Sequence, residues 1–186
     1  SPPDRRPWEP MPLLTVGHGT LAQEALAELL VGAGVGLVVD VRSYPGSRRH
    51  PQFGREAMEE WLPAAGVAYR WERRLGGRRR PAPDSPHVAL RHEGFRGYAD
   101  HMATEPFRQA LDAVLAERPS TAVLCSESVW WRCHRRLLAD AAVLLRGVEV
   151  THLLPDGRVA SHVPTEGVRI DGERLVYDVG AEVPML

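Results

Sequence analysis

The stretch that decides the fold is residues 13–41, LLTVGHGTLAQEALAELLVGAGVGLVVDV, where two apolar runs flank a segment of helical periodicity. The first run, residues 13–16, ends at a Gly-His-Gly turn. Residues 21–30 then place apolar side chains at helical spacing after Thr20, which can cap the helix. Residues 35–41 are almost continuously apolar, as in a strand buried on both faces. Together these segments make a βαβ unit, so the two strands should be parallel.

The alternation of strands and helices continues along the chain. Further helices are expected at residues 54–65, 98–102, 106–116 and 133–145. Further strands are expected at residues 67–71, 122–125 and 148–153, then a hairpin around Asp156-Gly157 and short strands near residues 169–170 and 175–177. The fold class is therefore α/β, with a mostly parallel Rossmann-like sheet, flanking helices and a small C-terminal β hairpin. We expect a single domain over residues 1–186, with its core at about residues 12–154 and a β appendage at about residues 155–186.

Composition narrows the class of protein. Of the 186 residues, 44% are hydrophobic and 25% are charged, which is ordinary for a soluble globular domain. No apolar run approaches the ~18 residues of a membrane helix, and residues 1–9 lack the basic-then-apolar pattern of a signal peptide. Cys125 and Cys133 are too few for a disulfide framework. We therefore expect a cytoplasmic protein with free thiols and no membrane partner.

Polar side chains follow the apolar runs, where parallel strands end and where α/β sheets bind ligands. His18 can act as acid, base or anion binder, or can simply hydrogen-bond within its turn. Asp40 and Arg42 share one face of their strand. They form either a structural ion pair or an anion anchor, in which Asp40 holds the arginine or acts as a base. We expect His18, Asp40 or Arg42, Glu127 and His134 to line one pocket.

The third buried strand and the helix after it carry another group of reactive residues. Glu127 can serve as nucleophile or general acid/base, or it can cap a helix or pair with an arginine. Cys133 and His134 open the helix, where a thiol has a lowered pKa. Cys125 is either a small buried hydrophobe or part of this thiol site. The Cys-x-Glu-x5-Cys-His spacing lacks a Cys-x-x-Cys pair, so we expect no metal and no other cofactor.

The middle of the chain is strongly basic. All 23 basic residues are arginines, and residues 42–96 contain 12 of them against 6 acidic residues, a local net charge of +6. Aromatic residues, among them Tyr44 and Phe53, are interleaved with these arginines. Arginine with stacking aromatics suits a phosphate backbone with unpaired bases. The alternative is a solvated face on which many arginines pair with neighbouring acids.

Short motifs in a fixed order point to a known family. They are Thr15-Val16-Gly17-His18, Val39-Asp40-Val41-Arg42 with Pro45, Ser47-Arg48 with Pro51 and Phe53, Leu75-Gly76-Gly77, Tyr98-Ala99-x-x-Met102, Leu124-Cys125-x-Glu127, Cys133-His134-Arg135 and Val150-x-His152. Over about residues 13–152 the chain resembles the domain of unknown function 488 family. One departure is the bulky Trp130-Trp131-Arg132 stretch, which could alter the shape of the pocket. The resemblance implies the fold and the place of the site. It implies no particular reaction, because the family name carries none.

Three functions compete. The first is an enzyme acting on nucleic acid, DNA above all, or on a nucleotide, which hydrolyses an N-glycosidic bond in base removal or repair. Its catalytic candidates are Glu127, Asp40, His18 and His134, and its substrate-binding candidates are Arg42, Ser47, Arg48, Phe53, Tyr98 and Arg135. The second is thiol or metal chemistry at Cys125, Glu127, Cys133 and His134. The third is a non-catalytic module that binds nucleic acid.

The arginine excess predicts salt-sensitive binding to single-stranded or distorted nucleic acid. Each neutralised phosphate releases counterions, so affinity should fall steeply as salt rises. Replacing Arg78, Arg79 and Arg80 together should weaken binding with little loss of stability, because a polar loop makes few core contacts. Fluorescence anisotropy with a labelled oligonucleotide measures this. Absence of binding at low salt, or affinity unchanged by the triple substitution, would exclude such a partner.

Overall fold

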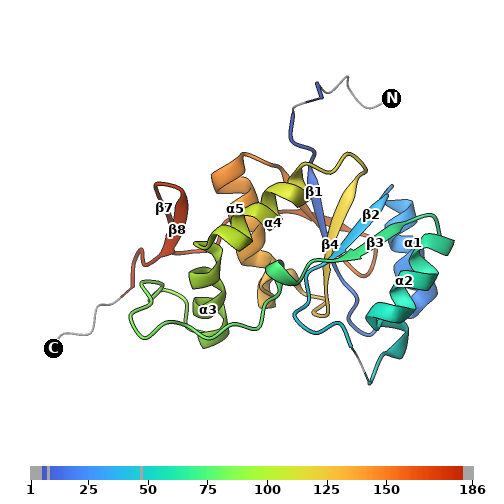
Figure 1. Cartoon of the computed structure of the whole chain (residues 1–186), viewed down its shortest axis with the longest axis horizontal. Helices are drawn as coiled ribbons and strands as arrows, with labels where there is room; N and C mark the ends of the chain where they lie inside the picture. The colour runs from blue at the N-terminus through green and yellow to red at the C-terminus, as the bar shows by residue number, and fades with distance from the viewer. Residues whose placement is uncertain (1–5, 8, 47, 182–186) are drawn as a thin grey trace.

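A six-stranded, mostly parallel sheet forms the centre of the computed structural model, which describes residues 6–7, 9–46 and 48–181 (Figure 1). The strands are β1 (Leu13–Gly17), β2 (Leu37–Asp40), β3 (Ala68–Trp71), β4 (Thr121–Cys125), β5 (Val150–Leu153) and β6 (Val159–Ser161). Their order is β3-β2-β4-β1-β5-β6, and β6 alone among these strands runs antiparallel to its neighbour. The expected α/β class with a mostly parallel sheet is confirmed.

Helices cover both faces of the sheet. One face packs on α1 (Gln23–Gly32) and α2 (Arg55–Ala64), and the other packs on α3 (Glu93–Met102), α4 (Glu105–Leu115) and α5 (Arg135–Arg146). The strands alternate between the two cores: Val38 joins the α1/α2 core, whereas Val39 joins the α3–α5 core. No helix in the described part of the chain is both long and apolar enough to cross a membrane.

The strand order refines the expected βαβ unit. β1 and β2 are parallel, but β4 lies between them and pairs with both. The hairpin around Asp156-Gly157 joins β5 to β6, so β6 belongs to the main sheet. The predicted C-terminal hairpin is present as β7 (Val168–Asp171) and β8 (Arg174–Tyr177), paired apart from that sheet.

Two helix starts differ from the sequence-based expectation. Thr20 does not cap α1: the N-cap is Ala22, and no side chain accepts a hydrogen bond there. Helix α5 begins at Arg135 with His134 as its N-cap, so Cys133 lies just before the helix rather than inside it. Short 3-10 turns occupy Pro51–Phe53 (η1), Arg73–Leu75 (η2) and Trp130–Arg132 (η3).

A chain of hydrogen bonds crosses the core from α5 through the sheet and back. Arg135 donates to the Thr15 hydroxyl (Nη1 to Oγ1, 3.3 Å), and this hydroxyl lies 2.6 Å from His152 Nδ1. His152 Nε2 lies 2.8 Å from His162 Nδ1, and His162 Nε2 lies 2.7 Å from Asp140 Oδ1. Since arginine only donates, all hydrogen bonds of this series point from Arg135 toward Asp140 when both imidazoles are neutral. Each ring then accepts at Nδ1 and donates through Nε2.

Asp140 ends this chain and ties the C-terminal segment to α5. Its side chain is fully buried, and its oxygens also accept hydrogen bonds from the Thr165 backbone N–H (3.0 Å) and the Tyr177 hydroxyl (2.9 Å). Tyr177 belongs to β8 and is itself buried. The carboxylate therefore positions the β7–β8 hairpin on the helical layer.

Removing the Asp140 side chain should destabilise the protein strongly. Asp140→Ala leaves three buried donors without their acceptor, and we expect the free energy of unfolding to fall by about 3 kcal/mol or more. Asp112→Ala is the control, because Asp112 is half exposed and pairs with Arg146 at the surface; its loss should cost at most about 1 kcal/mol. Urea unfolding followed by circular dichroism distinguishes them. Equal stabilities would contradict this role of Asp140.

Candidate functional site

A cavity of about 1750 Å³ opens at the carboxyl ends of β1, β2 and β4. The chain leaves β1 through α1 toward β2 and leaves β4 through α5 toward β5, so adjacent strands send their connections in opposite directions. Ligands of α/β proteins bind at such a topological switch point, in the crevice between the two strands whose connections diverge. The cavity brings together His18, Arg42, Glu127 and His134, as the positions of the strand ends predict.

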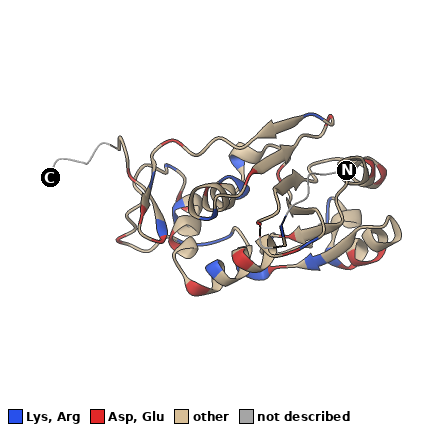
Figure 2. Ribbon diagram, turned by 90° about the horizontal axis from the view of Figure 1, so that it is seen from above, with Lys and Arg blue, Asp and Glu red and all other residues tan. Residues whose placement is uncertain are grey.

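The cavity wall is predominantly basic. Among the described lining residues there are two carboxylates, Glu93 and Glu127, against eight arginines: Arg42, Arg48, Arg49, Arg78, Arg79, Arg80, Arg91 and Arg132. Over the molecule as a whole both signs of charge occur (Figure 2). Most of these arginines are exposed, so their charges face solvent and any ligand that enters. The arrangement suits an anion with several negative groups.

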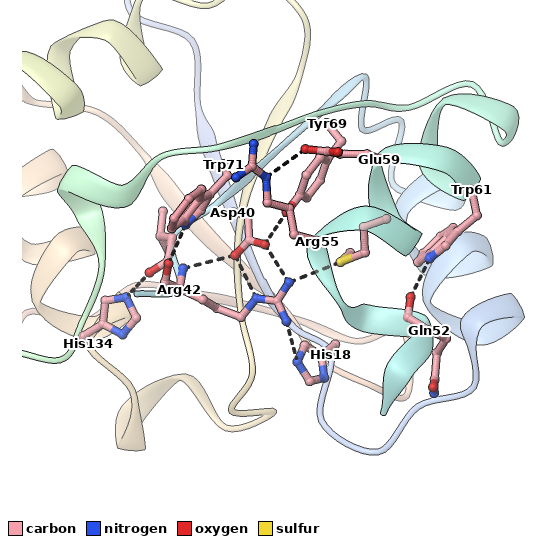
Figure 3. Close-up of polar contacts among 12 residues, drawn as sticks. His18, Asp40, Arg42, Gln52, Arg55, Glu59, Trp61, Tyr69, Trp71 and His134 are labelled. Atoms are coloured by element: carbon pink, nitrogen blue, oxygen red, sulfur yellow. Dashed lines mark hydrogen bonds and ion pairs between the residues drawn. The ribbon is translucent and has the colours of Figure 1, made fainter. Parts of the chain in front are cut away.

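Arg42 is held rigidly from behind (Figure 3). Its Nε and Nη2 donate to the two oxygens of buried Asp40, at 2.8 and 2.6 Å, and the Tyr69 hydroxyl donates to the same carboxylate at 2.5 Å. The remaining Nη1 lies 3.4 Å from His18 Nε2. A guanidinium that binds a carboxylate through two parallel hydrogen bonds keeps one orientation, so Arg42 presents a fixed positive charge to the cavity.

His18 serves this cluster as an acceptor. Its Nδ1–H donates to the Gly19 carbonyl (2.9 Å), which leaves Nε2 to accept from Arg42. Burial, with the nearby Arg42 charge, lowers the pKa of His18 from 6.5 to about 4, against the opposing effect of the Gly19 carbonyl. The ring is therefore neutral near pH 7, with both nitrogens engaged.

Two thiols lie at the floor of the cavity. Cys125 Sγ, at the end of β4, is 2.7 Å from Cys133 Sγ, just before α5. The Cys133 sulfur also accepts from the Arg135 backbone N–H at 3.5 Å and lies 3.5 Å from His134 Nδ1. Both cysteines line the cavity, yet only 2% and 5% of their surfaces are exposed.

The two thiols differ in their acidity. Burial raises the pKa of Cys125, and its hydrogen bond to Cys133 adds to this effect. Burial opposes ionisation of Cys133 as well, but the hydrogen bond from Cys125, the His134 ring and the Arg135 charge outweigh it and lower the Cys133 pKa well below its usual range. Cys133 is therefore the more acidic of the two thiols.

Glu127 contributes its backbone and its side chain separately. Its carbonyl accepts a 2.6 Å hydrogen bond from Arg135 Nη2, which fixes the loop after β4. The side chain is exposed in the cavity, where Oε1 lies 3.4 Å from the Val129 backbone N–H. Gly17 lies against this loop so closely that a Cβ atom there would be 1.8 Å from the Glu127 carbonyl oxygen.

Other candidate residues support the cavity from outside its wall. Phe53 is buried and stacks on His18 with ring centroids 4.5 Å apart. Tyr98 is buried, donates to the Leu75 carbonyl at 3.1 Å and lies edge-on to His134. Arg135 and Asp40 are also fully buried, whereas Arg48 is exposed on the wall. Ser47 lies outside the described residues.

Several contributing residues were not singled out by the sequence. Tyr69 completes the Asp40 cluster. Trp130, which the sequence suggested would alter the shape of the pocket, is not among the lining residues and instead stacks flat on the buried His152 ring, with centroids 4.2 Å apart. His50 and Arg91 line the cavity. Such long-range contacts leave no local pattern in the sequence. The Leu75-Gly76-Gly77 motif did carry one signal of a close approach, because a Cβ at Gly77 would collide with the His134 ring.

The fold and the cavity define an α/β protein with a basic site at the carboxyl ends of its strands. The family model described as "Domain of unknown function DUF488" matches residues 22–142, and the chain belongs to this family. The expected resemblance is confirmed, although His18 and His152 lie outside the matched span. No curated protein and no solved structure matches the chain. Within residues 6–7, 9–46 and 48–181, no group of three or more His, Cys, Asp or Glu side chains is placed to hold a metal ion.

Stability should fall in mild acid because of the buried histidines. His18 and His152, with pKa values lowered to about 4 and about 3 by burial, stay neutral when folded but take up protons when unfolded below about pH 6.5. The contribution of these two histidines to the free energy of unfolding is complete above pH 6.5. It is lost as the pH falls, by up to about 1.4 kcal/mol per pH unit for each histidine. Urea titrations from pH 7 to 5 should show this, with a shallower slope in His18→Gln. A flat wild-type profile, or equal slopes, would contradict it.

Proposed function

We propose that the cavity binds a phosphate-bearing nucleotide or nucleic acid, with DNA favoured, and that the protein hydrolyses an N-glycosidic bond in this ligand. The observation that carries the proposal is the arginine-lined wall at the carboxyl ends of the strands. Arginine binds phosphate with two parallel hydrogen bonds, and the Asp40 clamp holds Arg42 in place before any ligand arrives. Rigid positioning lowers the entropic cost of binding.

An exposed aromatic residue adds to this support. Tyr44 lines the cavity with 66% of its surface exposed, and the Arg78 guanidinium lies 5.6 Å from its ring centroid. A large aromatic surface open to solvent beside a cation is suited to stacking on an unpaired base. Phe53 and Tyr98 are buried, so Tyr44 takes the stacking role in this proposal.

Glu127 supplies the chemistry in this proposal. Asp40 lies behind Arg42, and both ring nitrogens of His18 are occupied, which leaves Glu127 as the carboxylate at the strand ends that can reach a ligand. There it would stabilise the oxocarbenium-like sugar or deprotonate the attacking water. The C–N bond breaks, the water oxygen bonds to the sugar carbon, and the proton lost by this water ends on the departing base. We place this activity in the cytoplasm, since both thiols are free.

Binding is tested with two arginine pairs. Arg79 donates to the Gly76 and Arg73 carbonyls, so it is left in place. Arg78→Ala/Arg80→Ala should lower affinity for a single-stranded oligonucleotide at least tenfold and reduce its salt dependence. Arg158→Ala/Arg174→Ala is the matched control, because these residues lie on the β5–β6 and β7–β8 hairpins and pair locally. Equal affinities for the two double variants would reject the basic wall as the binding site.

Catalysis is tested with Glu127→Gln, which keeps the shape and removes the charge. We expect this variant to fold and bind like the wild type but to lose most of its activity on a panel of modified-base oligonucleotides, with released bases measured by mass spectrometry. Cys125→Ser should retain much of the activity. If Glu127→Gln is active and Cys133→Ser is not, the chemistry belongs to the thiols. Binding without any product would leave a non-catalytic binding module.

A further inference from the structure

We propose that Cys125 and Cys133 form a redox-active dithiol site that reduces a small hydroperoxide and closes to an intramolecular disulfide. The proposal does not depend on the ligand of the cavity or on Glu127. It rests on the position of the two sulfur atoms, 2.7 Å apart at the cavity floor, and on the unequal surroundings of the two thiols. These are also the only two cysteines in the sequence.

Cys133 has the surroundings of the attacking sulfur. It lies immediately before α5, where the Arg135 backbone N–H points at its Sγ, and the His134 ring lies on another side. Donors and positive charge around a sulfur favour the thiolate, which is the form that attacks peroxides. Helix α5 has 12 residues, so its N-terminus adds a favourable dipole.

Cys125 has the surroundings of the resolving sulfur. It is buried at the end of β4, and its closest polar partner is the Cys133 sulfur itself. A low-pKa thiolate beside a second thiol is the arrangement in which oxidation stops at a disulfide instead of proceeding to sulfinic acid. No backbone rearrangement is needed to bring sulfur atoms together that already touch.

Access selects the oxidant by size. Cys133 exposes 5% of its surface to the cavity and Cys125 exposes 2%, so a molecule as small as hydrogen peroxide reaches them, whereas a bulky disulfide does not. His134 is pinned through Nε2 to the Val41 carbonyl at 2.8 Å, which keeps its ring beside the sulfur and the approach narrow.

The reaction balances with one peroxide per protein. The Cys133 thiolate attacks one peroxide oxygen, the O–O bond breaks, and sulfenic acid forms while hydroxide takes a proton from solvent. Cys125 then loses its proton and attacks Cys133 Sγ, the S–O bond breaks, and water leaves. With hydrogen peroxide, two thiols lose two electrons to one peroxide, which yields one disulfide and two waters, whereas an organic hydroperoxide yields one water and one alcohol. A dithiol reductant reverses the oxidation.

The experiment follows thiols in the full chain treated with stoichiometric hydrogen peroxide. Wild-type protein should lose both free thiols and 2 Da in intact mass, remain monomeric on non-reducing gels, and recover with dithiothreitol. Its rate of reaction should be at least tenfold above that of free cysteine at pH 6, where free cysteine is almost entirely protonated. Thiols that survive equimolar peroxide, or disulfide-linked dimers as the main product, would overturn the proposal.

Two single variants assign the roles. Cys125→Ser should still react with peroxide but should stop at sulfenic and then sulfinic acid on Cys133, seen as gains of 16 and 32 Da. Cys133→Ser should leave Cys125 unreactive, because burial keeps that thiol protonated. The reverse assignment would overturn the roles of the two sulfurs. If either variant does not fold, the wild-type mass change and its rate at pH 6 still decide the proposal.

Discussion

The buried guanidinium of Arg135 is the constraint on which the site depends. It is fully buried, and it donates both to the Glu127 carbonyl of the loop after β4 and to the Thr15 hydroxyl of β1. From the Thr15 hydroxyl the hydrogen bonds continue through His152 and His162 to the Asp140 carboxylate. The Arg135 charge also acts on the neighbouring Cys133 sulfur, whose pKa it helps to lower. The loop, two strands and α5 are therefore held by one hydrogen-bonded system.

The segment after β2 is pinned in the same way from two sides. Trp71 donates to the Arg42 carbonyl at 2.8 Å, and His134 contacts the Val41 carbonyl at 2.8 Å. Trp71 is the last residue of β3 and His134 lies immediately before α5, so the cavity wall is fixed by elements from both halves of the chain. The exposed charged side chains of this wall can therefore vary while the backbone that carries them stays in place.

Local patterns predicted the strands and their ends well, because a buried strand reads as an apolar run and the carboxyl ends of parallel strands share an edge. The shared face of Asp40 and Arg42 also followed from strand periodicity. In contrast, nothing local distinguishes an arginine on the wall, such as Arg48, from one in the core, such as Arg135. Burial is decided by which segments pack together, and the pairing of Thr15 with His152 and of Trp130 with the same ring is made only by the tertiary fold.

The close approach of Gly17 to the Glu127 carbonyl separates a fixed part of the site, the backbone after β4, from a part that can be redesigned. Backbone packs directly on backbone where Gly17 meets Glu127, so main-chain geometry fixes the loop after β4, and no side chain can be added at Gly17 without moving that loop. The rim of the cavity is made of long, exposed arginines and Tyr44. An engineer who wished to retarget this protein would find ligand preference adjustable at the rim and the position of the reacting groups already decided beneath it.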